Sequence, residues 1–225
     1  LATNGIKLAK DRGYAEDLMA AGRSTVYLHF DGVSKETNPK LASDEKAVRN
    51  CEEIGLGIVL VPTIIRGRND HEVGDIIRYA AEHIKVVRGV NYQPIAFTGA
   101  ASEEDVQRER ITIPELLEDI EDQTDGTIRK ADFYPVPCVV PFSDLVEAYT
   151  GKPQVRFTAH QHCGAATYVF ITDQGMVPIN RMIDVESFFK SVESMTEKLR
   201  KGGPLTKYRS LIEGIREMHE SVRKS

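Results

Sequence analysis

Two cysteines and two histidines in the second half of the chain are the residues best suited to bind a metal. Cys138 lies in the segment ADFYPVPCVVPF, and the HxHC segment supplies His160, His162 and Cys163. Thiolates bind soft or borderline metals and iron–sulfur clusters, and an imidazole can replace a thiolate at zinc or iron. In a strand, the two histidines would share one face and Cys163 would point away from it unless the chain turned at Gly164. We therefore predict part of a metal site, which needs a further donor. The alternative is that the cysteines are buried and the histidines bind substrate or solvent.

A second set of polar residues lies at or near the ends of apolar, strand-like segments in the first half of the chain. The set comprises Asn4, Asp31, Thr63, Arg66 and Gln93. In parallel βα barrels, ligands bind at the carboxyl ends of the strands, where loops place polar groups around an open face. The sequence therefore predicts that these side chains surround one ligand. For Asn4-Gly5 and Asp31-Gly32 the alternative is a tight turn, because these residue types favour turns.

The segments that would position this set alternate between strand-like and helical patterns. Apolar and β-branched runs predict strands at 24–30, 58–65 and 86–95, and helical spacing predicts helices at 14–21, 44–53 and up to about residue 83. Asn69-Asp70 is expected to cap the third helix, with Glu72 near the positive end of its dipole. This alternation is typical of βα units on a parallel sheet, so the predicted fold class is α/β.

The composition changes near residue 100, and the second half has a different pattern. Thr112-Ile113-Pro114-Glu115 predicts the start of an acidic helix. Three prolines in ADFYPVPCVVPF exclude a regular helix and predict an extended connector. We expect a short helix at 142–149 closed by Gly151, a strand-like run that includes the HxHC segment, and two final helices from about Val185 and Leu205.

Composition argues against several classes of protein. The net charge of −5 disfavours nucleic-acid binding, which depends on clustered Lys and Arg. The longest apolar run, around residues 54–65, is broken by glycines, Pro62 and Arg66 before it could span a bilayer. Three cysteines are too few and too scattered for a disulfide framework, so we expect a cytoplasmic protein in which Cys51 is a buried small hydrophobe. No GxxxxGKS/T loop or HExxH helix supports a nucleotide triphosphatase or hydrolase.

Several short motifs, taken in order, resemble one enzyme superfamily. TNG, FDG, PTIIRGRNDHE and NYQPI resemble the later half of the radical S-adenosylmethionine (radical SAM) barrel. DFYPVPC followed by HQHCGAATYVF is similar to the archaeal branch that includes tetraether lipid synthase and relatives once proposed to methylate a pterin precursor. The resemblance covers essentially the whole chain. It implies a partial (βα) barrel of the radical SAM type in residues 1–125 and a Cys/His-containing α/β extension in residues 126–225.

The resemblance also implies a cofactor site. It assigns the S-adenosylmethionine contacts to Asn4, His29, Asp31, Thr63, Arg66 and Gln93. Acceptors on His29 and Asp31 would suit ribose hydroxyls, and Arg66 would pair with the methionine carboxylate through two parallel hydrogen bonds. The superfamily holds a 4Fe-4S cluster in a CxxxCxxC motif, which this sequence lacks. We therefore expect the chain alone to be inactive and its abrupt start, LATNGIKLAK, to follow an upstream segment that carries the motif.

The function implied for the intact protein is radical chemistry on carbon. A 5′-deoxyadenosyl radical would abstract hydrogen from an unactivated carbon, and the enzyme would then join or alkylate carbon centres, with a membrane lipid as first substrate and a pterin precursor as the alternative. A long apolar channel would indicate lipid, and a small polar pocket would indicate pterin. A lipid substrate would place the enzyme at the membrane periphery. An auxiliary iron–sulfur cluster, or another metal, could use Cys138, His160, His162 and Cys163.

A third possibility belongs to another class. The chain could be a cofactor-free binding or scaffold domain that works with a separate cluster-bearing subunit. The exposed edge of the TNG strand would then seek a partner strand, for example from a second copy in a homodimer.

Overall fold

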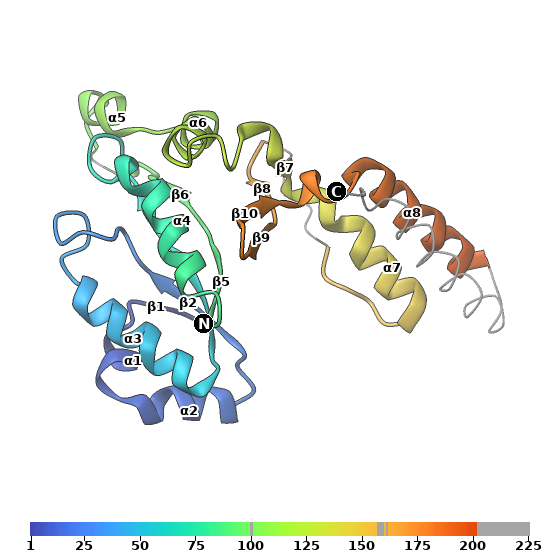
Figure 1. Cartoon of the computed structure of the whole chain (residues 1–225), viewed down its shortest axis with the longest axis horizontal. Coiled ribbons are helices and arrows are strands. Elements are labelled where there is room, and N and C mark those ends of the chain that lie inside the picture. Colours follow the sequence, from blue (N-terminus) through green and yellow to red (C-terminus); the bar gives the residue numbers. More distant parts are fainter. Residues whose placement is uncertain (100, 157–159, 161, 202–225) are drawn as a thin grey trace. The chain divides into compact units, whose positions relative to one another are not determined.

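The computed structural model describes residues 1–99, 101–156, 160 and 162–201. The chain divides into two compact units, Leu1–Gly126 and Thr127–Ser225, which are described separately (Figure 1). The helix predicted from about Leu205 lies outside the described residues. Assignment of residues 1–125 to a barrel portion and of 126–225 to an extension stays a proposal.

A parallel sheet forms the centre of the first unit. Its strands are β1 (Ala2–Thr3), β2 (Thr25–His29), β3 (Gly57–Val61) and β5 (Val87–Val90), in the order β1-β2-β3-β5. All three pairings are parallel. The α/β fold with a parallel sheet agrees with the sequence prediction, whereas the barrel stays a proposal.

The register of this sheet aligns the carboxyl ends of its strands. Thr3 pairs with Leu28, Leu28 with Leu60, and Leu60 with Val90, so these four residues are level across the sheet. Whatever follows each of them therefore emerges at the same edge of the sheet. This edge is where ligands bind in open α/β folds.

Two strands continue beyond this edge after a short break. Pro62 separates β3 from β4 (Thr63–Ile64), because proline has no N–H to donate to a ladder. Its carbonyl still accepts from the Gln93 N–H at 2.9 Å, and β6 (Gln93–Pro94) then pairs with β4 in parallel. The continuation places Thr63 directly opposite Gln93.

Helices cover the sheet and enclose the core of the first unit. They are α1 (Ile6–Lys10), α2 (Arg12–Ala20), α3 (Leu41–Ile54), the 3-10 helix η1 (Asp70–Glu72) and α4 (Val73–Glu82). Helix α1 packs along α3, as Figure 1 shows. Leu28 and Leu60 from the sheet are fully buried with Val48 and Cys51 from α3 and Ile76 from α4. Burial of these apolar groups is the main stabilising term of the fold.

Two further helices, α5 (Glu103–Glu109) and α6 (Ile113–Gln123), complete the first unit. Helix α6 begins with the predicted motif: the Thr112 side chain accepts from the Glu115 N–H, and the Glu115 carboxylate accepts from the Thr112 N–H. A Cβ on Gly74 would lie 2.6 Å from the Gln123 Cβ, so a glycine is required where α4 approaches α6. The Gln123 amide also bonds to the Gly74 N–H and the Asp70 carbonyl.

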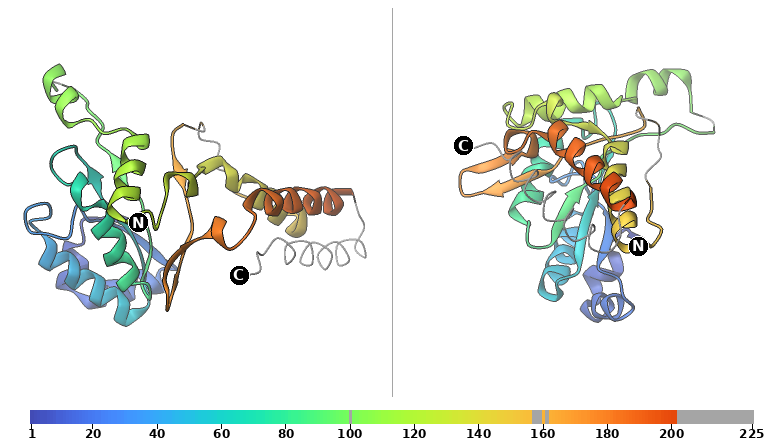
Figure 2. Two further views of the ribbon diagram at one scale, coloured as in Figure 1. Left: turned by 45° about the horizontal axis from the view of Figure 1, so that its top comes forward. Right: turned by 90° about the vertical axis from the view of Figure 1, so that its right-hand side faces the viewer.

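The second unit is built from short elements and two longer helices. Its elements are η2 (Lys130–Asp132), β7 (Tyr134–Pro135), η3 (Val136–Val139), α7 (Val140–Thr150), β8 (Ala165–Ala166), β9 (Val169–Thr172), β10 (Gly175–Pro178), η4 (Ile179–Arg181) and α8 (Val185–Lys201). Strands β9 and β10 form the antiparallel hairpin drawn in orange in Figure 2. Helix α7 packs along α8, and the Phe142 ring lies 5.6 Å from Phe188 and 5.7 Å from Phe189 between ring centroids.

The proline-rich segment corrects one prediction. Tyr134–Pro135 is extended, in β7, but from Val136 on the segment forms η3 and the start of α7, with Pro137 and Pro141 each in the second position of its helix. Proline is tolerated there because the first N–H groups of a helix have no intrahelical acceptor. Gly151, at φ 69°, ends α7 as predicted.

Within the described part of the chain, no helix is long and apolar enough to cross a membrane.

Candidate functional site

Four of the predicted ligand residues meet at the carboxyl edge of the sheet. The Asp31 carboxylate accepts the Thr63 N–H at 3.0 Å through Oδ1, and its Oδ2 lies 3.2 Å from His29 Nε2. Gln93 is the register partner of Thr63. The end of β2 and the starts of β4 and β6, which follow the ends of β3 and β5, therefore bring His29, Asp31, Thr63 and Gln93 to one location. The side chains of His29 and Asp31 are 44% and 28% exposed, so a ligand can reach them.

Asn4 lies at the same edge but also makes the turn that was the alternative prediction. It follows Thr3, which is level with Leu28, and its Oδ1 accepts the Ile6 N–H at 3.3 Å. Gly5 has φ 75°, and a Cβ there would lie 2.6 Å from Leu28 Cδ1. The Asn-Gly pair thus has a structural reason that is independent of any ligand.

Arg66 is paired with an acid in the first turn of α6. Its guanidinium lies 2.5 Å from a Glu115 carboxylate oxygen, and its main-chain N–H bonds to the Glu109 carbonyl. Hydrogen bonds from Arg66, and then from Thr112, lower the pKa of Glu115 to about 2. Binding of a ligand carboxylate by two parallel hydrogen bonds would require Arg66 to leave Glu115 or to share its donors with it.

Asn69 occupies the predicted N-cap position, at the start of η1, but its side chain makes no capping hydrogen bond. Its amide donates to the Asp31 carbonyl at 2.8 Å and to the Thr63 carbonyl at 2.9 Å, and its Oδ1 accepts the Ile65 N–H at 2.9 Å. The residue is 4% exposed. Asn69 therefore joins the end of β2 to the end of β4, and it does so through main-chain groups that any sequence would present.

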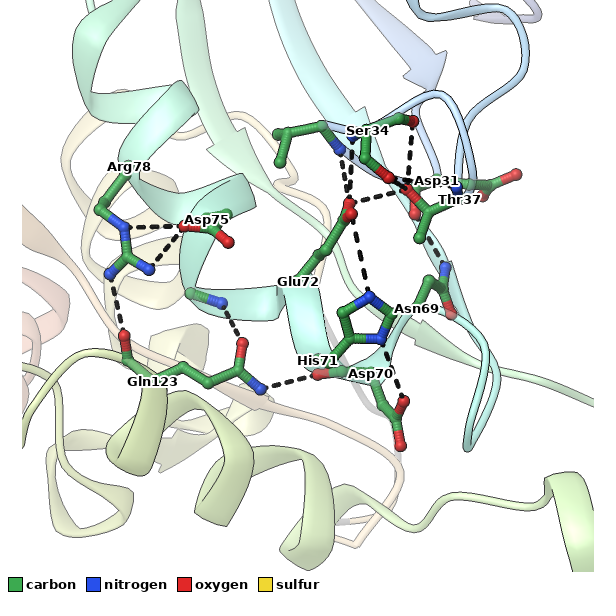
Figure 3. A network of polar contacts seen from close by, with 12 residues as sticks. Asp31, Ser34, Thr37, Asn69, Asp70, His71, Glu72, Asp75, Arg78 and Gln123 are labelled. Atoms are coloured by element: carbon green, nitrogen blue, oxygen red, sulfur yellow. Dashed lines mark hydrogen bonds and ion pairs between the residues drawn. The ribbon is translucent and has the colours of Figure 1, made fainter.

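Glu72 is a second residue whose role differs from the one predicted. Figure 3 shows its carboxylate directed at the loop that follows β2, where Oε2 accepts the Val33 N–H at 2.7 Å and the Thr37 hydroxyl at 2.7 Å. The Ser34 N–H lies at 3.4 Å. Burial raises the pKa of Glu72, but hydrogen bonds from Ser34, Thr37 and Val33 outweigh it, so the pKa lies below its usual value.

Gly32 of the FDG motif is required by packing. A Cβ at this position would lie 1.9 Å from Thr37 Oγ1 and 2.5 Å from Glu72 Oε2. Any other residue would displace the loop from the carboxylate. The motif therefore has a packing basis in addition to the turn that the sequence suggested.

A buried pair holds the other side of the same loop. The Asn38 amide donates to the Gly32 carbonyl at 3.3 Å and to Asp44 Oδ2 at 2.9 Å, and Asn38 Oδ1 accepts the Lys40 N–H. Asp44 is fully buried, and its Oδ1 has no hydrogen-bond partner among the described residues. Burial is the largest cause that raises the pKa of Asp44.

Glu72, Asn38 and Asp44 also belong to this site, although the sequence did not predict them as members. Glu72 and Asp44 stand in helical first turns, where a carboxylate has a local explanation through the helix dipole. For Glu72, the signal that could have indicated a tertiary role is its place as the last residue of the PTIIRGRNDHE motif, whereas Asn38 and Asp44 lie in none of the motifs.

The Cys/His segment is a turn, not a strand. The Cys163 N–H bonds to the His160 carbonyl at 2.8 Å, and the His162 N–H lies 3.3 Å from His160 Nδ1. The two imidazole centroids are 5.0 Å apart. The strand-like run predicted here is therefore wrong, and with the turn the sharing of one strand face by the two histidines no longer applies.

The β7–β8 ladder brings Cys138 and this turn to the same end. Pro135 pairs with Ala165, and the Val136 N–H bonds to the Gly164 carbonyl at 3.1 Å. Yet among the described residues, no three His, Cys, Asp or Glu side chains form a group that could hold a metal ion. A metal at Cys138, His160, His162 and Cys163 therefore stays a proposal that needs other donors.

Cys51 is the buried small hydrophobe that the sequence predicted. It is fully buried in α3. Burial raises the pKa of its thiol to about 11, so the thiolate that metals and electrophiles require is disfavoured.

Comparison of the sequence with known proteins identifies enzymes to which this chain is similar. No protein-family model matches the chain. The chain is 48% identical over 209 residues to 7,8-dihydro-6-hydroxymethylpterin dimethyltransferase of Methanocaldococcus jannaschii. The aligned region covers 89% of the chain and 41% of that protein. Over 215 residues it is 23% identical to GTP 3′,8-cyclase of Clostridium acetobutylicum, covering 89% of the chain and 62% of the cyclase. The cyclase of Listeria monocytogenes is 29% identical over 111 residues, which is 46% of the chain and 32% of that enzyme.

These relatives support the resemblance to the radical SAM superfamily. They do not show its archaeal lipid synthase branch. The chain spans 41% and 62% of the lengths of the first two relatives.

Proposed function

We propose that this chain forms the S-adenosylmethionine side of a radical SAM enzyme that alkylates an unactivated carbon. The observation that carries the proposal is the meeting of His29, Asp31, Thr63 and Gln93 at the carboxyl ends of successive parallel strands. The similarity to a pterin dimethyltransferase supports methyl transfer to a pterin ahead of lipid coupling, which reverses the order that the sequence motifs suggested.

The residues present fit S-adenosylmethionine, but they do not supply ligands for the 4Fe-4S cluster. Carboxylate, imidazole and amide groups on the strand ends suit the hydroxyl and amino groups of an adenosyl ligand. The 4Fe-4S cluster has no ligand set here, because the sequence lacks CxxxCxxC and no metal group occurs among the described residues. S-adenosylmethionine, when bound and reduced, supplies the radical chemistry.

The contribution of this chain would be to bind and orient. The Thr63 N–H fixes Asp31 through Oδ1, which leaves Oδ2 beside His29 as the acceptor for a ribose hydroxyl. Gln93 would contact the ligand from the neighbouring strand end. Holding the ligand in one orientation directs its reactive carbon at the substrate and accounts for much of what positioning adds to a rate.

A binding titration tests this proposal without the cluster. S-adenosylhomocysteine is titrated into the chain by calorimetry, with Asp31→Asn and Asp75→Asn compared. Asn at 31 keeps an oxygen for the Thr63 N–H but removes the charge, so we expect about tenfold weaker binding, about 1.4 kcal/mol. Asp75 is an exposed carboxylate paired with Arg78 on α4, and its variant should bind as the wild type does. A wild-type chain that does not bind would overturn the proposal.

A membrane lipid is the second candidate substrate. It is supported by large apolar side chains that are exposed in the second unit: Phe142, Val146, Tyr149, Val155, Tyr168, Phe170, Ile171 and Met182. The two substrates are separated by an assay in the polypeptide that carries the CxxxCxxC motif. Formation of 5′-deoxyadenosine that depends on a reduced pterin supports methyl transfer, and formation that depends on a long-chain lipid supports coupling.

Pairing of two copies of the chain through the exposed edge of β1 also stays a proposal.

A further inference from the structure

The buried polar residues of the described part of the chain concentrate at one loop. Seven such residues are buried: Asn38, Asp44, Asn69, Glu72, Thr124, Asp132 and Thr196. Asn38 lies in the loop from Asp31 to Lys40, which follows β2, and the side chains of Asp44, Asn69 and Glu72 bond to that loop. Burying polar groups is costly unless they are hydrogen-bonded, and each such group needs a structural reason. We call these four residues the loop clamp.

The loop clamp holds the loop from two different elements. Asn69 and Glu72, beside and within η1, bond to Asp31, Val33 and Thr37, as Figure 3 shows. On the other side, Asp44 of α3 holds Asn38, which in turn holds the Gly32 carbonyl. The backbone of the loop is therefore fixed at successive points before any ligand arrives.

The clamp acts directly on a residue of the proposed binding site. Asn69 holds the main-chain carbonyl of Asp31 at 2.8 Å and also the carbonyl of Thr63, whose N–H holds the Asp31 carboxylate. Both ends of Asp31 are thus set by groups that the clamp controls. A loop ordered in advance costs less free energy to order upon binding.

We propose that the loop clamp preorganises Asp31 for the adenosyl ligand, with Glu72 as its principal positioning residue. This inference rests on the proposed function. We name Glu72 as the principal residue because one of its carboxylate oxygens accepts three hydrogen bonds from the loop, from the N–H groups of Val33 and Ser34 and from the Thr37 hydroxyl. Hydrogen bonds to a charged acceptor are about twice as strong as those between neutral groups.

The test combines two variants of the clamp with two measurements. Glu72→Gln removes the charge at nearly constant volume, and Thr37→Val removes one hydroxyl donor while keeping the shape of the side chain. Hydrogen exchange at Val33 and Ser34 reports the state of the loop, and calorimetry reports the affinity for S-adenosylhomocysteine. We expect about tenfold weaker binding for Glu72→Gln and about threefold weaker binding for Thr37→Val. Hydrogen exchange at Val33 and Ser34 should become faster in both variants, and more so in Glu72→Gln than in Thr37→Val. Thr37→Val decides the matter if Glu72→Gln does not fold.

Asp132→Asn is the matched control. Asp132 is a carboxylate that is 3% exposed and accepts from the Arg129 N–H at 2.7 Å and the Asn180 amide at 2.8 Å, but it belongs to the second unit. Its variant should be less stable yet bind with wild-type affinity and leave exchange at Val33 unchanged.

The outcomes separate this inference from the proposed function. If the wild type binds and the clamp variants bind equally well despite faster exchange, the clamp has only a structural role and the inference is overturned, while the proposed function stands. If the wild type does not bind, the proposed function fails and the inference fails with it.

Discussion

The loop after β2 and the turn that contains His160, His162 and Cys163 both carry candidate ligand residues, but they are held in different ways. Asp31 is fixed by bonds to residues far away in sequence, Thr63 and Asn69. In the turn, the described hydrogen bonds are local, and His160 and Cys163 are exposed. The first region is thus preorganised by the fold, whereas the second offers donors that would become a site only with further groups. A ligand site on the first can be tested on this chain alone.

Removal of Asn69 should give the largest difference between the two regions. Asn69→Ala leaves the carbonyls of Asp31 and Thr63 and the N–H of Ile65 without their partner, at a cost of about 3 kcal/mol in the free energy of unfolding. His160→Ala should change it by less than about 0.5 kcal/mol, because the side chain is exposed. Urea unfolding measures both. Equal effects would contradict the contrast between a fixed loop and a locally bonded turn.

Replacement of two glycines by alanine, one in each region, should reduce the stability by smaller amounts. In Gly32→Ala the new Cβ would lie 1.9 Å from Thr37 Oγ1, so we expect about 2 kcal/mol of destabilisation from overpacking. In Gly164→Ala the nearest atom would be Val136 Cγ2 at 3.1 Å, which a small movement relieves, and about 0.5 kcal/mol is expected. Thermal unfolding distinguishes the two, and a tolerated Gly32→Ala would show that the loop is not held closely by Glu72.

Acid should weaken the clamp through Glu72. Its pKa is lower in the folded state than the ordinary value of 4.5, so its stabilisation is fully present above pH 4.5 and is lost as the pH falls through the folded-state pKa. The contribution of Asp44 to the pH dependence of stability has the opposite sign, because its pKa is raised. Asp44 is present in both wild type and Glu72→Gln, so the difference between their unfolding free energies reports the contribution of Glu72 alone. His71, whose Nε2 lies 4.0 Å from Glu72 Oε1, is present in both proteins.

The difference in unfolding free energy between wild type and Glu72→Gln should therefore shrink between pH 5 and pH 3, by about 1 kcal/mol or less. Urea unfolding at each pH measures it. A difference that grows on acidification would contradict the lowered pKa and the role of the carboxylate as an acceptor.

The smallest expected effect concerns the metal proposal. Cys163→Ser should change the stability of this chain by less than about 0.5 kcal/mol, because Cys163 is exposed. In the anaerobically prepared polypeptide that carries CxxxCxxC, the same substitution should reduce the iron or zinc content if the turn supplies a ligand. Elemental analysis that finds neither metal beyond the cluster of that motif would reject the proposal.

The sequence predicted the fold where local chemistry and packing agree. The β-branched run before Phe30, the glycine stop at Gly55 and the Thr112-Glu115 capping pair all act over a few residues, so their patterns are visible along the chain. Parallel order then follows from the alternation of strands and helices. This reasoning was sufficient to place Asp31 and Gln93 at the same edge.

The remaining features depended on contacts between distant residues. Asn69 has the residue type of a helix cap, and only the fold shows that its amide reaches Asp31 and Thr63 instead. Pro137 and Pro141 excluded a helix by composition, yet each stands where a helix begins. The HxHC segment was read with strand periodicity, and a turn replaced it. In each case the residue type permits two local structures, and tertiary packing selects one.

The most direct test of the account is to map where an adenosyl ligand touches this chain. S-adenosylhomocysteine is titrated into the isotopically labelled protein, and amide chemical shifts are followed by NMR. We expect changes concentrated at His29, at Asp31 to Ser34, at Thr63 and at Gln93. Changes centred on residues 160–163, or no change at saturating ligand, would contradict it.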